Sequence, residues 1–282
     1  MTSKNPKKIH HRPERRRTAG FGWKPDLPDA RDHYFSVRPE TQKKLPARVN
    51  NLRAKCPPVY DQGEIGSCTA NAIAGAIEFE RRKAAQKPGF TPSRLFIYYN
   101  ERAMEGSTGN DAGAQIRDGI KSVNRQGACP EKMWSYDDTP AVSDGGPWPA
   151  GAKPAQKPPK TCYDKALDYQ AIQYQRVMPI LSQMKGCLAE GNPFVFGFTV
   201  YASFYGANGA PRKVVPMPTS KDRVLGGHAV LAVGYDDKAQ QFFVRNSWGR
   251  DNQDRGYFYM PYSYLTDAGL ADDFWVIRLI ER

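Results

Sequence analysis

The chain has 282 residues, of which 40% are apolar and 12% aromatic, an ordinary composition for a globular protein. This length allows one large domain or two small lobes, and the formal net charge is +12. The longest apolar runs, such as residues 194–200, are far shorter than the roughly 20 residues of a membrane-spanning helix, so we expect no membrane span.

Residues 1–17 are strongly basic, with seven Lys and Arg against one Glu, which is half of the net charge of the chain. Such a block is usually a solvated, disordered tail. It lacks the apolar stretch of ~7–15 residues that a secretory signal needs, so we expect a cytoplasmic protein or one exported without a classical signal peptide. The block could also contact an anionic ligand or surface.

Residues 18–44 mix aromatic side chains with prolines and carboxylates, which is typical of an extended arm and not of a helix. The arm is too apolar for a free tail and too rich in proline for an independent fold. Its rings are therefore expected to lie in a groove of the folded body. Two interpretations stay open, a short prosegment-like arm that blocks a cleft and a structural strap.

Residues 62–68 lead into a run of small and apolar residues at helical spacing that starts at Thr69. Gly66 and Ser67 supply a turn and an N-cap, so Cys68 falls in the first turn of the predicted helix. There the helix dipole favours an anion and biases a thiol toward thiolate. A cysteine at a helix start is more often a packed apolar residue, so chemistry requires a base elsewhere.

The rest of the chain predicts an α+β protein. Helices are expected over residues 92–101, 112–125 (ended by Gly127) and 179–190, and strands over 171–177, 194–201, 228–235, 242–246, 256–260 and 273–280. Proline-rich residues 137–161 indicate a surface insertion. We divide the chain into the tail and arm (1–44), a helical lobe with Cys68 (45–170) and a β-rich lobe (171–282).

Of the four histidines, only His228 lies in a core-like setting, at the start of a glycine-flanked apolar strand. The next predicted strand carries Asn246, which could orient the imidazole. A nucleophile, a base and an orienting amide are the three parts of nucleophilic acyl transfer. Because Cys68 comes from the first lobe and the other two from the second, the predicted site lies in the cleft between them.

These motifs, in this order, resemble the papain family (C1) of cysteine peptidases, and among them the bacterial xylellain-type members. The resemblance rests on residues 62–68, 228–235 and 246–249, and covers about 45–282. It implies a papain-like two-lobe fold, with a helical left lobe, a β-sheet or barrel-like right lobe and the active-site cleft between them. It also implies a thiol endopeptidase that hydrolyses polypeptide substrates without a cofactor or a metal.

The resemblance further implies a role for each motif residue. Cys68 and His228 would form a thiolate–imidazolium pair, with Asn246 holding the ring and Trp248 shielding that contact. Gln62 and the Cys68 backbone N–H would form the oxyanion hole.

For substrate binding, the resemblance implies backbone hydrogen bonds from Gly227 and Gly113, and less directly from Ala112. Two residues depart from the family pattern: Ile65 replaces a cysteine, which removes one family disulfide, and Thr69 replaces a tryptophan, which changes the packing behind the nucleophile. Four further cysteines allow three pairings, and without an export signal we favour reduced thiols: Cys56, Cys129, Cys162 and Cys187.

Three alternatives remain open at this point. The chain could be a papain-fold binding protein that has lost activity, or an adaptor that binds anionic partners through its basic tail. The same machinery would also allow acyl transfer to an amine instead of water. In every case we expect a monomer.

Overall fold

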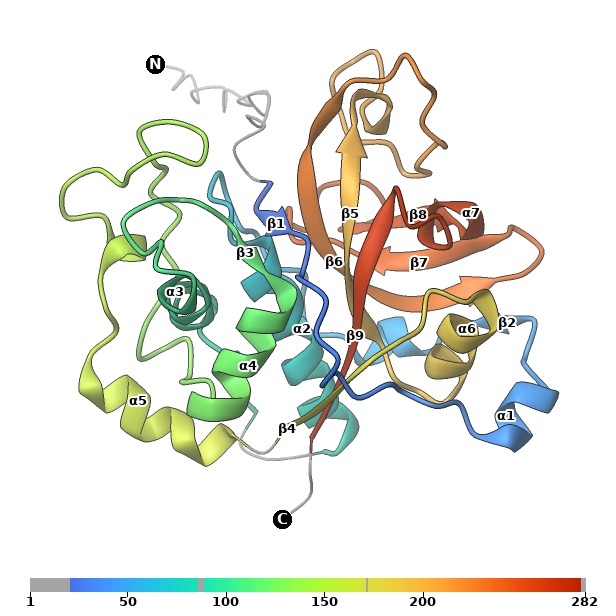
Figure 1. Ribbon diagram of the computed structural model, residues 1–282, viewed down its shortest axis with the longest axis horizontal. Coiled ribbons are helices and arrows are strands. Elements are labelled where there is room, and N and C mark those ends of the chain that lie inside the picture. Colours follow the sequence, from blue (N-terminus) through green and yellow to red (C-terminus); the bar gives the residue numbers. More distant parts are fainter. Residues whose placement is uncertain (1–20, 86–88, 171, 280–282) are drawn as a thin grey trace, which may run out of the picture.

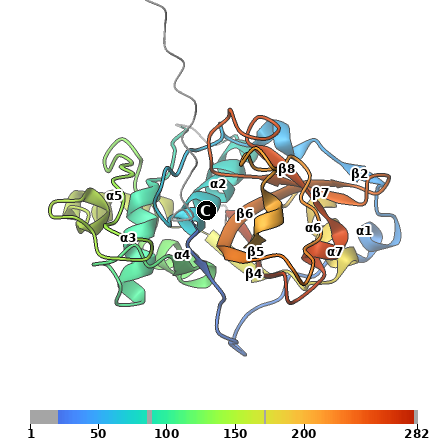
Figure 2. The same cartoon turned by 90° about the horizontal axis from the view of Figure 1, so that it is seen from above.

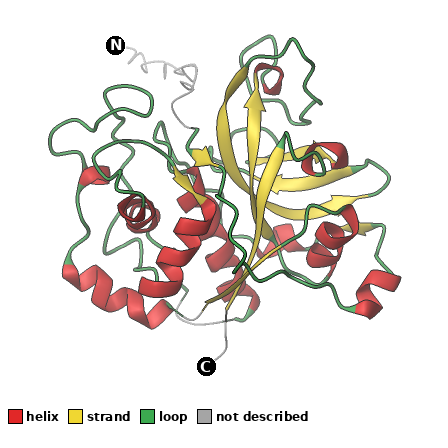
Figure 3. Ribbon diagram, in the orientation of Figure 1, coloured by secondary structure: helices red, strands yellow, loops and turns green. Residues whose placement is uncertain are grey.

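The computed structural model describes residues 21–85, 89–170 and 172–279. It has the α+β architecture that the sequence predicts, with the helices of residues 68–166 on one side and an antiparallel sheet, accompanied by the remaining helices, on the other (Figure 1, Figure 3). The basic tail, residues 1–17, lies outside the described residues. Within the described part of the chain, no helix has the length and apolar character to cross a bilayer.

The elements follow the chain in this order. The α-helices are α1 (Pro39–Lys43), α2 (Cys68–Lys83), α3 (Arg94–Met104), α4 (Ile116–Gln126), α5 (Lys160–Ala166), α6 (Leu181–Ala189) and α7 (Tyr262–Leu265). The strands are β1 (Trp23–Lys24), β2 (Arg48–Val49), β3 (Ala114–Gln115), β4 (Ile172–Arg176), β5 (Phe194–Tyr201), β6 (Val224–Asp236), β7 (Gln241–Arg245), β8 (Tyr257–Pro261) and β9 (Ala271–Leu279).

The large sheet has the strand order β4-β9-β5-β6-β7-β8, and β2 pairs with β6. All of these pairings are antiparallel, whereas β1 and β3 form a separate parallel pair. In β5 the alternate residues Phe194, Phe196 and Phe198 are fully buried and contribute aromatic rings to the core. The register of β5 sets Phe198 opposite His228, so the sheet itself fixes the position of the histidine.

Helix α2 lies between α3 and α4 on one side and the sheet on the other, as the view from above also shows (Figure 2). Its residues from Cys68 to Glu80 are all buried, because the helix is covered on every side. Small residues allow this close packing: a Cβ at Gly75 would lie only 2.8 Å from the guanidinium of Arg245. The N-terminal end of α2 therefore presents Cys68 at the junction of the two parts.

Several predicted boundaries shift. Helix α3 begins after Ser93, whose hydroxyl accepts from the Phe96 N–H at 3.1 Å, as the Pro-Ser start predicts. Helix α4 begins at Ile116 and not at residue 112, because the two residues before it form β3 against β1. It ends at Gly127, which has a φ of +75°, as predicted.

Two further predictions are corrected. Strand β6 begins at Val224, so His228 is not at the start of its strand, as the sequence suggested. Residues 39–43 of the arm form the short helix α1, although the whole arm was predicted to be non-helical; Pro39 stands in its first turn, where its missing N–H costs nothing.

Candidate active site

Cys68 is the first residue of α2 and is fully buried, which confirms its predicted place in the first turn. Ser67 occupies the N-cap position, but its side chain does not cap the helix. Its hydroxyl instead lies 2.6 Å from the hydroxyl of Tyr136 and accepts from the side-chain amide of Asn71 at 3.0 Å. Ser67 is therefore the N-cap residue, as predicted, although its hydroxyl binds these polar groups and not a helix N–H.

The His228 ring is held from several sides. Its Nε2 lies 2.9 Å from Oδ1 of Asn246, as the sequence suggested. The indole of Trp248 stacks on the imidazole, with ring centroids 4.8 Å apart and an interplanar angle of 28°. Asn246 in turn donates to Oε1 of Gln253 at 3.0 Å, which fixes the orientation of its amide.

Gln62 is also buried, and its amide has a defined orientation. Its Oε1 accepts from the hydroxyl of Ser247 at 2.6 Å, and its backbone N–H donates to the Ser247 carbonyl at 2.8 Å. Its Nε2 donates to the carbonyl of Ile65 at 3.0 Å. The oxygen of the amide therefore points toward Ser247 and the NH₂ group toward the loop that leads to Cys68.

Asp111 links that loop to the edge that carries Gly113. Both of its carboxylate oxygens lie 3.0 Å from the Gly66 nitrogen, and the Tyr98 hydroxyl donates to it. The Tyr98 oxygen also accepts from the Gly113 N–H at 3.3 Å. Ala112 stands between Asp111 and Gly113 and is partly exposed. Burial raises the pKa of the Asp111 carboxyl, while its hydrogen bonds oppose that rise.

The N-terminal arm runs between these groups (Figure 1). Strand β1 pairs in parallel with β3, and the Ala114 N–H donates to the carbonyl of Gly22 at 2.7 Å. A Cβ on Gly22 would lie 1.8 Å from the Gly66 carbonyl oxygen, and a Cβ on Gly113 would lie 2.0 Å from the Gly22 oxygen. Backbone therefore packs directly on backbone, and only glycine fits at Gly22 in this position.

The ring of Phe21 covers the other side of the site. Its centroid lies 5.8 Å from that of His228 and 6.0 Å from that of Trp248. A Cβ on Gly226 would lie 2.8 Å from the Phe21 Cβ. The arm thus contacts the base as well as the loop before the thiol.

The next residue but one, Trp23, fills a pocket of the β-rich part. A Cβ on Gly197 would lie 2.0 Å from its indole, and a Cβ on Gly227 would lie 2.4 Å from its carbonyl oxygen. The indole N–H donates to Oδ2 of Asp273 at 3.0 Å. The two glycines therefore leave room for an indole, and the Asp273 carboxylate lies where the indole N–H ends.

This cover changes the electrostatics of the thiol. Burial raises the pKa of Cys68 to about 11, and backbone hydrogen bonds involving Ala229 and Gly22 only partly oppose that rise. In this covered arrangement, burial therefore opposes the bias toward thiolate that the helix terminus favours. Ala229 directly follows His228 on β6, so the sulfur lies beside the strand that carries the base.

All five cysteines lie within the described residues, where each is buried and free. Thr69, one of the two departures from the family pattern, donates its hydroxyl to the buried Glu101 at 2.6 Å. Ile65, the other departure, is completely buried. Both replacements are thus accommodated behind the nucleophile, by a hydrogen bond and by apolar packing.

Comparison with known families decides what this arrangement is. A sequence model described as papain family cysteine protease matches residues 45–276. The chain belongs to the papain family of cysteine proteases. This papain-family protease is 39% identical over 281 residues to the uncharacterized peptidase C1-like protein L477 of Acanthamoeba polyphaga mimivirus, covering 92% of this chain and 86% of that protein.

Solved structures agree with the family. Xylellain, a cysteine protease from Xylella fastidiosa, is 49% identical to this papain-family protease, with a TM-score of 0.89 over 95% of this chain and 99% of that one. The digestive procathepsin L 3 of Tenebrio molitor has a TM-score of 0.62 at 18% identity, covering 93% of this chain and 77% of that one. The predicted resemblance, the papain-like fold and the cysteine protease activity are confirmed.

Sequence reasoning missed four residues that shape the site of this papain-family protease. Ser247 and Asp111 stood inside the motifs, but their side chains received no role. Gln253 and Asp273 carried no local signal at all, because their partners lie elsewhere in the chain. A polar residue next to a motif residue, such as Ser247, is the one signal that could have been used.

Proposed function

We propose that Cys68, His228, Asn246 and Gln62 carry out the peptide-bond hydrolysis of this protease. The supporting observation is the placement of the His228 imidazole. The ring is hydrogen-bonded to Asn246 and stacked on Trp248, and the next residue, Ala229, makes a backbone hydrogen bond with the Cys68 sulfur. Asn246 leaves the opposite edge of the ring to the thiol.

The reaction follows from these positions. The Cys68 thiolate attacks the scissile carbonyl, and the imidazolium of His228 gives its proton to the leaving amine. The imidazole then takes a proton from water, which attacks the thioester and releases the acid. The NH₂ group of Gln62, which the bond from Ser247 orients, donates a hydrogen bond to the oxyanion, as does the Cys68 N–H.

We further propose that the arm blocks this site. The Gly22 carbonyl accepts from the Ala114 N–H, and a backbone hydrogen bond joins Gly22 to the Cys68 sulfur. The arm backbone thus lies against the sulfur, where it covers the nucleophile. Removal of the arm would rehydrate the Cys68 thiol and lower its pKa.

The same arm is also a strap. The Phe35 N–H donates to the Arg176 carbonyl at 2.7 Å, and the Phe35 side chain is buried. Val37 is buried too, and a Cβ on Gly186 would lie 2.5 Å from it. We therefore propose that both interpretations apply: residues 21–23 block the active site, and residues 35–37 attach the arm to the body.

For polypeptide substrates, we propose that the path of residues 21–23 marks the binding strip. The backbone edges at Gly113 and Gly227, with Ala112 beside them, would bind an extended chain, and Trp248 would border it. The basic tail would bind an anionic ligand or surface, which a measurement of binding at increasing salt concentrations tests. We propose that the protease acts as a monomer.

The experiment combines two variants. In a Gly22→Val background, where the arm is displaced, Cys68→Ala should abolish cleavage of a denatured protein substrate. Gly22→Val should make Cys68 react with iodoacetamide at pH 6 at least about tenfold faster, because the added side chain expels the arm from the site. If Gly22→Val reacts as slowly as the wild type, the blocking arm is wrong; if Cys68→Ala still cleaves, the assigned nucleophile is wrong.

A further inference from the structure

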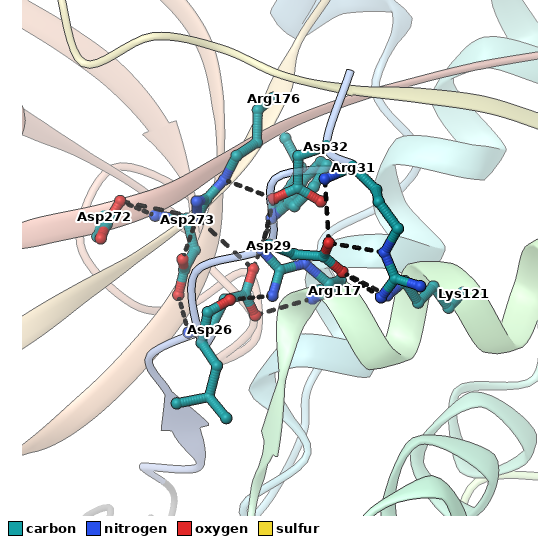
Figure 4. Close-up of polar contacts among 11 residues, drawn as sticks. Asp26, Asp29, Arg31, Asp32, Arg117, Lys121, Arg176, Asp272 and Asp273 are labelled. Atoms are coloured by element: carbon teal, nitrogen blue, oxygen red, sulfur yellow. Dashed lines mark hydrogen bonds and ion pairs between the residues drawn. The ribbon is translucent and has the colours of Figure 1, made fainter. Parts of the chain in front are cut away.

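Charged residues of the arm meet charged residues from both parts of the body just beyond Trp23 (Figure 4). The arm supplies Asp26, Asp29, Arg31 and Asp32; α4 supplies Arg117 and Lys121; β4 supplies Arg176; and β9 supplies Asp272 and Asp273. The arm therefore connects a helix of the helical lobe with two strands of the sheet through one network of ion pairs.

The inner part of this network is enclosed. Asp32 accepts from the guanidinium of Arg117 at 2.5 Å and lies 3.7 Å from that of Arg176. Asp26 accepts from the Arg117 backbone N–H at 3.1 Å and from the indole of Trp275 at 2.9 Å. These bonds leave the two arm carboxylates with almost no exposed surface, 0% for Asp26 and 6% for Asp32.

Asp273 brings a third carboxylate into the same space. Its side chain is 0% exposed, and its two oxygens bind Arg176 at 2.5 Å and the Asp26 N–H at 2.8 Å. Arg176 lies 3.7 Å from the Asp26 carboxylate as well. The body carboxylate and the arm carboxylate thus share one guanidinium and are held close by a backbone hydrogen bond.

The charges of the enclosed part do not balance. Inside the enclosure three carboxylates face two guanidiniums. Asp272 is 52% exposed, and Asp29 pairs with Lys121 and with the exposed Arg31, whose charge also acts on Asp32 from outside the enclosure. A buried charge without a counter-charge is strongly unfavourable, so such groups take up or lose a proton instead. The enclosed cluster is neutral when it holds one proton.

We propose that Asp26, Asp32 and Asp273, with Arg117 and Arg176, form a proton-dependent latch. It keeps the arm closed while the cluster holds one proton and lets the arm open as the pH rises to neutrality. The effect on activity rests on the blocking arm proposed above, but the latch itself concerns only the position of the arm. The proton belongs to the cluster as a whole and not to one named oxygen.

The acid–base properties of the carboxyls agree with this direction. Burial, and then the charge of Asp273, raises the pKa of Asp26 to about 7 from its ordinary 3.8, and burial raises that of Asp273 as well. A proton held only in the closed state stabilises closure fully below the ordinary carboxyl pKa of 3.8, and this stabilisation decreases as the pH rises and is gone above about 7. Hydrogen bonds from Arg31 lower the pKa of Asp29, so that outer carboxylate responds only in stronger acid.

The test follows hydrogen–deuterium exchange of the backbone amides of residues 21–35 in the full chain, corrected at each pH for the intrinsic exchange rate. Three chains are compared between pH 5 and pH 8: the wild type, Asp32→Asn and Asp29→Asn. Asp32→Asn removes one of the three enclosed negative charges, whereas Asp29→Asn makes the same change on the same arm outside the enclosure.

We expect the opening constant of the wild type to rise with pH by up to about tenfold per unit and to level off above pH 7, which is the slope of one proton. Asp29→Asn should keep that rise, and Asp32→Asn should flatten it whatever its absolute level. A flat wild-type profile, a wild type that opens toward acid within this range, or an unchanged slope in Asp32→Asn would each overturn the latch.

Iodoacetamide labelling of Cys68 in the same samples separates the two proposals. The ratio of wild-type to Asp32→Asn labelling at each pH removes the ionisation of the thiol itself, and should follow the exchange profile. If exchange follows the pH as expected but this ratio stays constant, the latch stands and the blocking role fails. If Gly22→Val exposes Cys68 but the exchange does not depend on pH, the block stands and the latch fails.

Discussion

At the scale of single residues, the orientation of two side-chain amides in the site is fixed by the hydrogen bonds that they make to neighbouring residues. The Gln62 oxygen is taken by Ser247, so the amide cannot turn around and present an acceptor to a developing oxyanion. Asn246 is fixed in the same way between His228 and Gln253. These outer bonds convert two flexible amides into oriented ones, which is the condition for electrostatic stabilisation of a transition state.

We expect Gln62→Ala, tested in a Gly22→Val background where the arm is displaced, to lower kcat on a small peptide by about 10²–10³. Its amide acts on a charge that exists only during the reaction, so the alkylation rate of Cys68 should stay nearly unchanged. Ser247→Ala is the matched control and should cause a smaller loss, because the amide remains but is less well oriented. A wild-type kcat in Gln62→Ala would remove this residue from the mechanism.

Asn246→Ala should behave differently, since it releases the imidazole. We expect both kcat and the Cys68 alkylation rate to fall, because a mobile ring no longer pairs with the thiol. Gln253→Ala, which leaves Asn246 in place, should reduce both quantities less. The two rates are measured on the same preparations, and a loss of kcat with unchanged alkylation would contradict an orienting role.

At the scale of elements, glycines decide how closely two segments approach. Gly22 and Trp23 pass between Gly66 and Gly113 on one side and Gly197 and Gly227 on the other. A Cβ on Gly22, Gly113, Gly197 or Gly227 would lie 1.8–2.4 Å from an atom across these contacts. The strip is therefore shaped for an extended backbone, and the space above Gly197 accepts an indole. A substrate that replaced the arm would meet the same wide pocket.

Gly197→Val should narrow that pocket. We expect kcat/KM for peptides with a large aromatic residue to fall by about 10–200-fold relative to peptides with a small one, the range of a lost hydrophobic fit. The comparison again uses the Gly22→Val background, with the melting temperature as a control for folding. Equal losses for both peptides would mean that the Trp23 pocket does not bind substrate side chains.

At the scale of the whole molecule, the arm ties the two parts of the protease together. Its contacts reach α4 through Asp32, β9 through Trp23 and Asp26, and α6 through Val37. The arm therefore affects stability and access to the cleft at once, but through different residues.

Deletion of residues 1–44 should lower the melting temperature and also speed the alkylation of Cys68, whereas deletion of 1–17 should do neither. Point variants separate the two effects. Gly22→Val should expose Cys68 with little loss of stability, and Val37→Ala should cost about 2 kcal/mol without exposing it. Differential scanning calorimetry and alkylation rates measure both, and faster alkylation in Val37→Ala would mean that strap and block act as one unit.

The sequence by itself determined the features that depend on local pattern. Small and apolar residues at helical spacing predicted the helix that starts at Cys68, alternation predicted the strands of the large sheet, and the order of motifs predicted the family. The tertiary structure alone decided the burial of the thiol, the bond from Ser247 to Gln62 and the path of the arm. Those contacts join residues as far apart as Asp26 and Asp273, 247 positions along the chain. Periodicity says which face of an element is buried but not which distant side chain covers it, so such partners emerge only when the chain has folded.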